Sequence, residues 1–135
     1  MAFRIIYYET LDSTNNLALV FAKEGAREGT VIVAEYQTKG RGRFDQKWVS
    51  PRGTGLLFSV ILRPSLSASS ASILTHLAAQ SVSEVLKTDF NLPAKLKKPN
   101  DVLVDGKKIA GILTESSTLQ KRIEYVVVGI GLNVS

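Results

Sequence analysis

Apolar and β-branched residues form three separate runs in the first half of the chain, and each run has the length and composition of a β-strand. The runs cover Phe3 to Tyr8, Thr30 to Tyr36, and Leu56 to Leu62, the last of which stops before Pro64. Between the second and third runs, Gln37 to Gly55 is rich in glycine and charge. The pattern predicts three strands, with a long loop that is typical of a functional segment.

Helical spacing of apolar residues occurs twice. Asp12-Ser13-Thr14 precedes a pattern at helical intervals through Leu17 and Phe21, which predicts a helix that begins near Ser13. A second pattern of this kind predicts a long helix over Ile73 to Lys87.

The second half of the chain carries the strongest hairpin signal. Asp105-Gly106 lies between β-forming residues, which predicts a tight turn. Pro93 to Lys97 predicts a short strand, and Ile109 to Glu115 should pair with Ile123 to Val128. Successive hairpins with interspersed helices predict an α+β fold, with a mixed, mainly antiparallel β-sheet and flanking helices.

Composition limits the architecture and several kinds of chemistry. A chain of 135 residues with 44% hydrophobic content is expected to form one domain over residues 1–135. No apolar run is long enough to cross a bilayer, and the N-terminus does not resemble a signal peptide, so a cytoplasmic protein is expected. The absence of cysteine excludes disulfides and thiolate chemistry. The one histidine, His76, lies in the predicted second helix and is not expected to be catalytic.

The loop contains the most distinctive charged motif, Gly40-Arg41-Gly42-Arg43. Guanidinium groups bind carboxylate or phosphate through paired hydrogen bonds, and glycine lets backbone N–H groups approach a ligand closely. A solvated basic surface loop explains the same residues equally well. The net charge of +5 favours an anionic partner without selecting one. We expect no nucleic acid partner, because the aromatic residues are not interleaved with the basic ones.

Nucleotide-binding motifs of the Walker and Rossmann types are absent from the sequence. Five other motifs occur in order along the whole chain, and together they resemble the catalytic domain of biotin protein ligases. They are Asp12 to Asn15; Gly40 to Arg43, with Trp48, Ser50-Pro51 and Arg63-Pro64 after it; Lys97 to Asp101; Lys107 to Leu113; and Gly129 to Asn133.

The resemblance implies a fold of the class II aminoacyl-tRNA synthetase and biotin synthetase type. It also implies an ATP-dependent ligase that converts biotin to biotinyl-5'-AMP and transfers biotin to a lysine of a biotin carboxyl carrier protein. The implied substrates are biotin and ATP, and Mg²⁺ is expected because ATP brings it. Asp101 and Glu115 are both candidate Mg²⁺ ligands, and the sequence does not select between them.

The resemblance also implies roles for individual residues. Catalysis is assigned to the cations Arg41, Arg43 and Lys108. Biotin binding is assigned to Ser13, Thr14, Asn15, Gln37, Arg41, Gly42, Arg43, Lys108 and Gly111. ATP binding is assigned to Arg41, Arg43, Trp48, Lys97, Asn100 and Asn133. A plain helix N-cap is an alternative role for Ser13 and Thr14, and a core aromatic position is an alternative for Trp48.

Three departures from the family pattern affect the prediction. Phe44, Asp45 and Gln46 follow Arg43 where the family tends to have a glycine and another basic residue. Lys98 replaces the tryptophan of the family's K-W-P-N-D motif, and the chain ends at Ser135, directly after the last motif. We therefore expect no N-terminal DNA-binding domain and no C-terminal β-barrel, reduced activity, and exposed apolar surface that favours self-association as a homodimer. A lipoate-protein ligase and a non-catalytic module that binds biotin or its adenylate are the alternatives.

Overall fold

A computed structural model describes residues 2–44, 46–97 and 100–133. Its seven strands form one sheet in the order β1-β2-β3-β7-β6-β5-β4. The first three elements are β1 (Arg4–Leu11), α1 (Thr14–Lys23) and β2 (Thr30–Gln37), and β1 and β2 pair in parallel. All other neighbouring strands in the described sheet pair antiparallel, so the predicted mixed, mainly antiparallel α+β fold is confirmed.

The remaining elements follow the predicted order. They are β3 (Gly55–Leu62), a 3₁₀ turn η1 (Ala68–Ser70), α2 (Ala71–Thr88), β4 (Ala94–Lys97), β5 (Asp101–Val104), β6 (Lys107–Leu119) and β7 (Arg122–Asn133). The predicted Asp105-Gly106 hairpin is confirmed, with φ of 52° and 77° at its two central residues. A second tight turn, at Gln120-Lys121, lengthens β6 and β7 beyond the predicted bounds.

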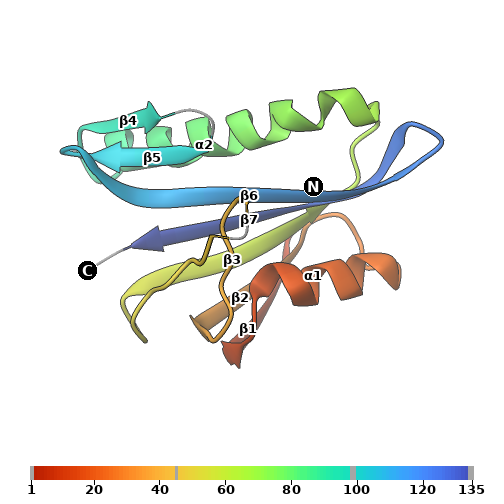
Figure 1. The fold of residues 1–135 in the computed structure, drawn as a ribbon, viewed down its shortest axis with the longest axis horizontal. Coiled ribbons are helices and arrows are strands. Elements are labelled where there is room, and N and C mark those ends of the chain that lie inside the picture. Colours follow the sequence, from red (N-terminus) through yellow and green to blue (C-terminus); the bar gives the residue numbers. More distant parts are fainter. Residues whose placement is uncertain (1, 45, 98–99, 134–135) are drawn as a thin grey trace.

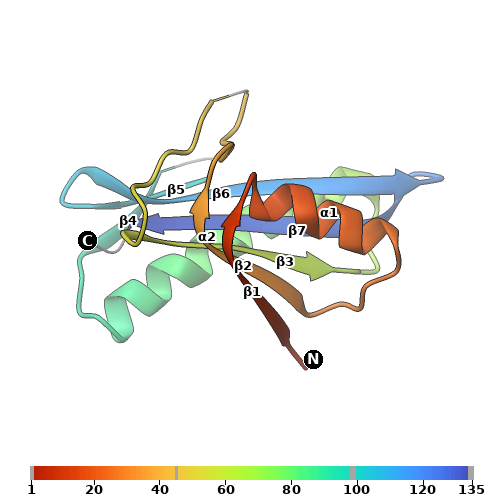
Figure 2. The ribbon, with the colours of Figure 1, turned by 90° about the horizontal axis from the view of Figure 1, so that it is seen from below.

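The two long helices cover opposite faces of the sheet (Figures 1 and 2). Alternation along β7 produces this arrangement, because successive side chains of a strand point to opposite faces. Val127 packs with Ala18 and Ala22 of α1, whereas Val126 and Val128 pack in the core that α2 covers. We call the side of the sheet that carries α1 the α1 face.

Helix α1 is held at both of its ends. Ser13 caps the N-terminus, and its hydroxyl accepts a hydrogen bond from the Asn16 backbone N–H. At the other end, the Arg63 guanidinium donates hydrogen bonds to the carbonyl oxygens of Ala22 and Ala26, at 2.7 and 2.8 Å. Because the Ala22 carbonyl lies in the last turn of α1, at the negative end of the helix dipole, the cation is well placed. The helix is therefore fixed relative to β3.

The side of β1 that faces away from α1 carries exposed apolar side chains. Ile5 and Tyr7 are 68% and 59% exposed, and Phe3, just before the strand, is 64% exposed, while the alternate residues Ile6 and Tyr8 pack against the α1 core. The exposed apolar surface expected from the sequence is thus present on this edge strand. Self-association through it stays a prediction.

Candidate functional site

Glycines form a shallow trough on the α1 face of the sheet. In the cross-strand register, Gly131 of β7 lies between Leu57 of β3 and Gly111 of β6. Gly129 lies in the next row, between Ser59 and Leu113. Residues aligned across neighbouring strands share a face, so the missing side chains leave adjoining space above β6 and β7, beside Leu57 and Ser59 of β3.

Two side chains from outside the sheet enter this trough. The Asn15 amide lies where a Cβ on Gly129 would be, and the Trp48 indole comes within 2.5 Å of an ideal Cβ position on Gly131. The same ring also covers Gly111, where Cζ3 is 2.9 Å from the ideal Cβ position. The glycines are therefore required by close approach of side chains to the sheet backbone.

The N-terminus of α1 supplies a cluster of neutral polar groups. Ser13, Thr14 and Asn15 are all buried, and the Thr14 backbone N–H donates to Gln37 Oε1 at 2.7 Å. The Ser59 hydroxyl lies between Thr14 Oγ1, at 2.7 Å, and Asn15 Oδ1. A hydroxyl has one proton and an amide oxygen only accepts, so both contacts are hydrogen bonds when Ser59 donates to Asn15 Oδ1 and accepts from the Thr14 hydroxyl. The helix-cap role considered for Ser13 is real, and it places the neighbouring groups beside the trough.

The loop after β2 folds back on itself above the α1 face (Figure 2). Arg41 and Lys47 form an isolated antiparallel bridge, and the Trp48 N–H donates to the Gly40 carbonyl at 2.9 Å. A Cβ on Gly40 would collide with the Trp48 carbonyl, which explains glycine at this position. The fold of the loop thus directs Trp48 toward the sheet.

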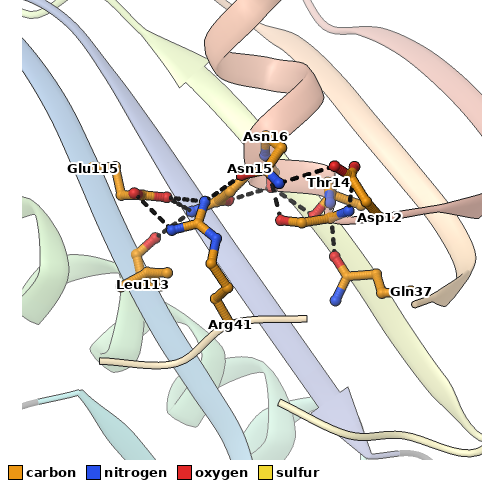
Figure 3. Close-up of polar contacts among 10 residues, drawn as sticks. Asp12, Thr14, Asn15, Asn16, Gln37, Arg41, Leu113 and Glu115 are labelled. Carbon is orange, nitrogen blue, oxygen red and sulfur yellow. Dashed lines mark hydrogen bonds and ion pairs between the residues drawn. The ribbon is translucent and has the colours of Figure 1, made fainter. Parts of the chain in front are cut away.

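Arg41 and Glu115 form a bidentate ion pair beneath the loop (Figure 3). Arg41 Nη1 donates to Glu115 Oε2 at 2.9 Å, and Nη2 donates to Oε1 at 2.8 Å and to Asn16 Oδ1 at 2.6 Å. Glu115 Oε1 also accepts from Asn15 Nδ2 at 2.9 Å. Partial burial raises the pKa of Glu115, but the hydrogen bonds from Arg41 and Asn15 outweigh it, so the pKa lies below its ordinary value. The hydrogen bonds to Glu115 raise the pKa of Arg41.

Two further cations, Arg43 and Lys108, line the site. Lys108 Nζ is 3.1 Å from Asp101 Oδ1 and 5.2 Å from the centre of the Trp48 ring. The Arg43 guanidinium carbon lies 4.6 Å from the centre of the Phe44 ring. Both positions suit cation–π contact. The Trp48 Nε1 atom is buried and has no hydrogen-bond partner among the described residues.

These groups surround a cavity of about 230 Å³. All nine residues assigned to biotin from the sequence line it. Of the residues assigned to ATP, Arg41, Arg43, Trp48 and Asn100 line it. Lys97 and Asn133 lie at the ends of β4 and β7, outside the lining. Lys98, whose substitution for tryptophan the sequence singled out, is outside the described residues.

The other candidate residues have definite places. Asn100 is buried, and its Nδ2 donates to the Ile112 carbonyl at 2.6 Å, which joins the turn before β5 to β6. Asp101 and Glu115, the candidate metal ligands, are each paired with a different cation. Within residues 2–44, 46–97 and 100–133, no group of three or more metal-ligating side chains is present. His76 lies exposed on α2, away from the cavity lining.

Sequence reasoning missed part of the site. It did not identify Ser59, which is completely buried beside Thr14 and Asn15, or Leu57, which lines the cavity. Both lie on β3 in register with Gly129 and Gly131. Glycines at alternate positions of a strand lie on one face of the sheet. This alternation was the available signal, because the residues of β3 that pair with the two glycines share that face.

Comparison with known proteins agrees with this geometry. A model of the biotin/lipoate A/B protein ligase family matches residues 7–133. The bifunctional ligase/repressor BirA of Bacillus subtilis is 41% identical over the whole chain, and the biotin–[acetyl-CoA-carboxylase] ligase of Paracoccus denitrificans is 40% identical over 92% of it. The structure of the Aquifex aeolicus biotin protein ligase in complex with biotin and ATP superposes with a TM-score of 0.78, at 38% identity over 98% of this chain.

The chain spans about half the length of these proteins. It covers 42% of the Bacillus subtilis protein, 52% of the Paracoccus denitrificans protein and 53% of the Aquifex aeolicus chain. None of the helices in the described structure is long and apolar enough to cross a membrane.

Filling the trough should damage the site and the fold together. Gly129→Ala places a methyl group where the Asn15 amide lies, so we expect the free energy of unfolding to fall by about 1–3 kcal/mol, as for other overpacked sites. Urea denaturation measures this change. Gly42→Ala is the matched control, because a Cβ there makes only ordinary contacts with Gln46. An equal loss in both variants would contradict the packing argument.

The lowered pKa of Glu115 predicts a pH-dependent contribution to stability. A carboxyl group whose pKa is lowered by folding stabilises the native state at pH values above its pKa in the unfolded chain, which is near 4.5. This contribution is lost as the pH falls through the pKa of the folded state. The stability difference between the wild type and Glu115→Gln should therefore shrink below about pH 4.5. Urea denaturation from pH 7 to 3 measures it. The pKa of Asp12 is also lowered, chiefly by a hydrogen bond from Asn16. This residue is present in both the wild type and the variant.

Proposed function

We propose, because the chain belongs to the biotin/lipoate A/B protein ligase family, that it forms the catalytic core of an ATP-dependent biotin protein ligase. The observation that carries the proposal is the cavity, whose lining combines neutral polar groups, cations and apolar side chains. Biotin combines the matching chemistry, with a ureido ring, an apolar bicycle and a carboxylate. Ligand pockets of this kind combine apolar walls with a few placed polar groups.

The neutral polar groups suit the ureido ring. Ser13, Thr14, Asn15 and Gln37 offer hydroxyl and amide groups that can both donate and accept hydrogen bonds. These groups are held by their own hydrogen bonds to one another and to the helix, so they need little rearrangement on binding. Trp48 and Leu57 supply apolar surface along the trough.

The cations of the lining suit the reacting groups. The biotin carboxylate attacks the α-phosphorus of ATP, the bond to the leaving pyrophosphate breaks, and biotinyl-5'-AMP forms. Both reactants are anionic, so Arg43 and Lys108 would reduce their repulsion and stabilise the charge of the transition state. An acceptor lysine of a biotin carboxyl carrier protein then attacks the acyl carbon and AMP leaves. No covalent intermediate with the chain is required.

The nucleotide would lie beside Trp48, with Lys97, Asn100 and Asn133 toward its side of the site. Mg²⁺ commonly binds through one or two carboxylates together with substrate phosphates, and Asp101 is the carboxylate that lines the described cavity. Asp101 therefore fits a Mg²⁺ ion carried by ATP. The proposed setting is the cytoplasm, with the carrier protein as macromolecular partner, without nucleic acid or membrane, and with a homodimer as the proposed oligomer.

Ligand titration tests the proposed function directly. We expect calorimetry to detect biotin binding, and we expect biotin and ATP together to release pyrophosphate. Lipoate is the matched competitor, because the family also includes lipoate ligases. Tighter binding of lipoate would overturn the proposal in favour of a lipoate-protein ligase. Biotin binding without pyrophosphate release would indicate a non-catalytic binding module.

The two cations should be essential for adenylate formation. We expect Arg43→Ala and Lys108→Ala each to lower the rate of pyrophosphate release by about 100-fold or more, the scale of losing one positioned charge donor. Lys107→Ala is the matched control, because Lys107 is adjacent on β6, exposed and outside the cavity lining. Near-wild-type release from both site variants would remove the roles assigned to them.

A further inference from the structure

Glu115 joins three separate parts of the chain. It lies on the α1 face of β6, where it is aligned with Val127 of β7, a residue of the core that packs against α1. Its carboxylate accepts hydrogen bonds from Arg41 in the loop and from Asn15 at the start of α1 (Figure 3). Asn15 also donates to the Leu113 carbonyl of the same strand, at 3.2 Å. The loop, the helix and the sheet therefore meet at one carboxylate.

The geometry of the pair is that of a strong fixed contact. Parallel N–H···O bonds between guanidinium and carboxylate, at 2.8 and 2.9 Å, are about twice as strong as neutral hydrogen bonds and also set orientation. The two side chains are only 36% and 28% exposed, so water screens the pair less than an ordinary surface pair. A third bond, from Arg41 Nη2 to Asn16 Oδ1, attaches the guanidinium to α1 as well.

These contacts separate the two arginines of the Gly40 to Arg43 motif. Both terminal nitrogens of Arg41 already donate to protein acceptors, and its charge is balanced by Glu115. A substrate carboxylate could bind Arg41 in the same bidentate way only by displacing Glu115, which would leave that half-buried carboxylate without its cation. Arg43, two residues further along, lines the cavity and contacts Phe44 through its guanidinium.

We propose that Glu115 is a positioning residue, which acts by fixing Arg41 as a strut between the loop and the sheet, so that Arg41 is not a ligand of the substrate anions. This inference rests on the proposed function for the identity of those anions. The strut itself is a property of the ligand-free chain. It holds Asn15 over Gly129 and keeps the base of the loop above the trough, so that the cavity exists before the ligand arrives.

The strut makes a prediction for the ligand-free protein. Glu115→Gln, Arg41→Gln and the double variant should each open the loop, and we expect trypsin to cleave after Arg43 about tenfold faster or more, given the strength of hydrogen bonds to charged groups. Mass spectrometry identifies the cleavage site, and circular dichroism verifies that each variant is folded. Glu124→Gln on β7 is the matched control, because Glu124 is exposed and accepts a hydrogen bond only from Ser117 in the described structure.

A double-mutant cycle separates a strut from an anion ligand. If Arg41 acts through Glu115, both single variants and the double variant should raise the KM for biotin by a similar factor, about tenfold, with kcat changed much less. If Arg41 binds the substrate anion, Glu115→Gln should release it and lower that KM, while Arg41→Gln alone should be strongly impaired. Additive effects of the two substitutions would likewise overturn the proposal.

The two readouts also distinguish this inference from the proposed function. A wild-type chain that binds no biotin and releases no pyrophosphate would refute the ligase, while the trypsin result would still decide the strut. Conversely, unchanged cleavage in Glu115→Gln would refute the strut even in an active ligase.

Discussion

Close approach of side chains to a bare stretch of sheet is the constraint on which the site depends. Gly129 and Gly131 lie on one face of β7, Gly131 is aligned with Gly111 on β6, and Asn15 and Trp48 occupy the space above these glycines. A methyl group at either glycine of β7 would occupy the place of one of these side chains. The register of β3, β7 and β6 therefore determines where a small molecule fits, and the polar and cationic groups are arranged around that space.

The alternation of β7 links the site to the core. Along the α1 face of this strand, Val127 belongs to the packed core, and the next two positions on that face are glycines. The same strand presents Val126 and Val128 to the core beneath α2. One strand thus supports both helices and provides the floor of the cavity. Because Ser13 and Arg63 fix the two ends of α1, its N-terminal amide and hydroxyl groups have a defined position above that floor.

The order of elements and most of the cavity lining could be predicted from the sequence, because periodicity and the motifs are local signals. The Asp105-Gly106 turn is one example, since both residues tolerate positive φ. Gln120 and Lys121 adopt similar φ values without a turn signature, so the extension of β6 and β7 could not be predicted. The pairing of Arg41 with Glu115 joins residues 74 apart in sequence. It depends on tertiary register, which separated charges do not specify.

The position of Trp48 has a practical consequence for observing this protein. It is the one tryptophan of the chain, and its ring lies over two glycines and beside the Lys108 ammonium group. Indole emission is sensitive to nearby charge and to contact with solvent. The tryptophan emission of the unlabelled chain therefore arises at the cavity itself, and changes in that emission would report changes in the surroundings of the Trp48 ring.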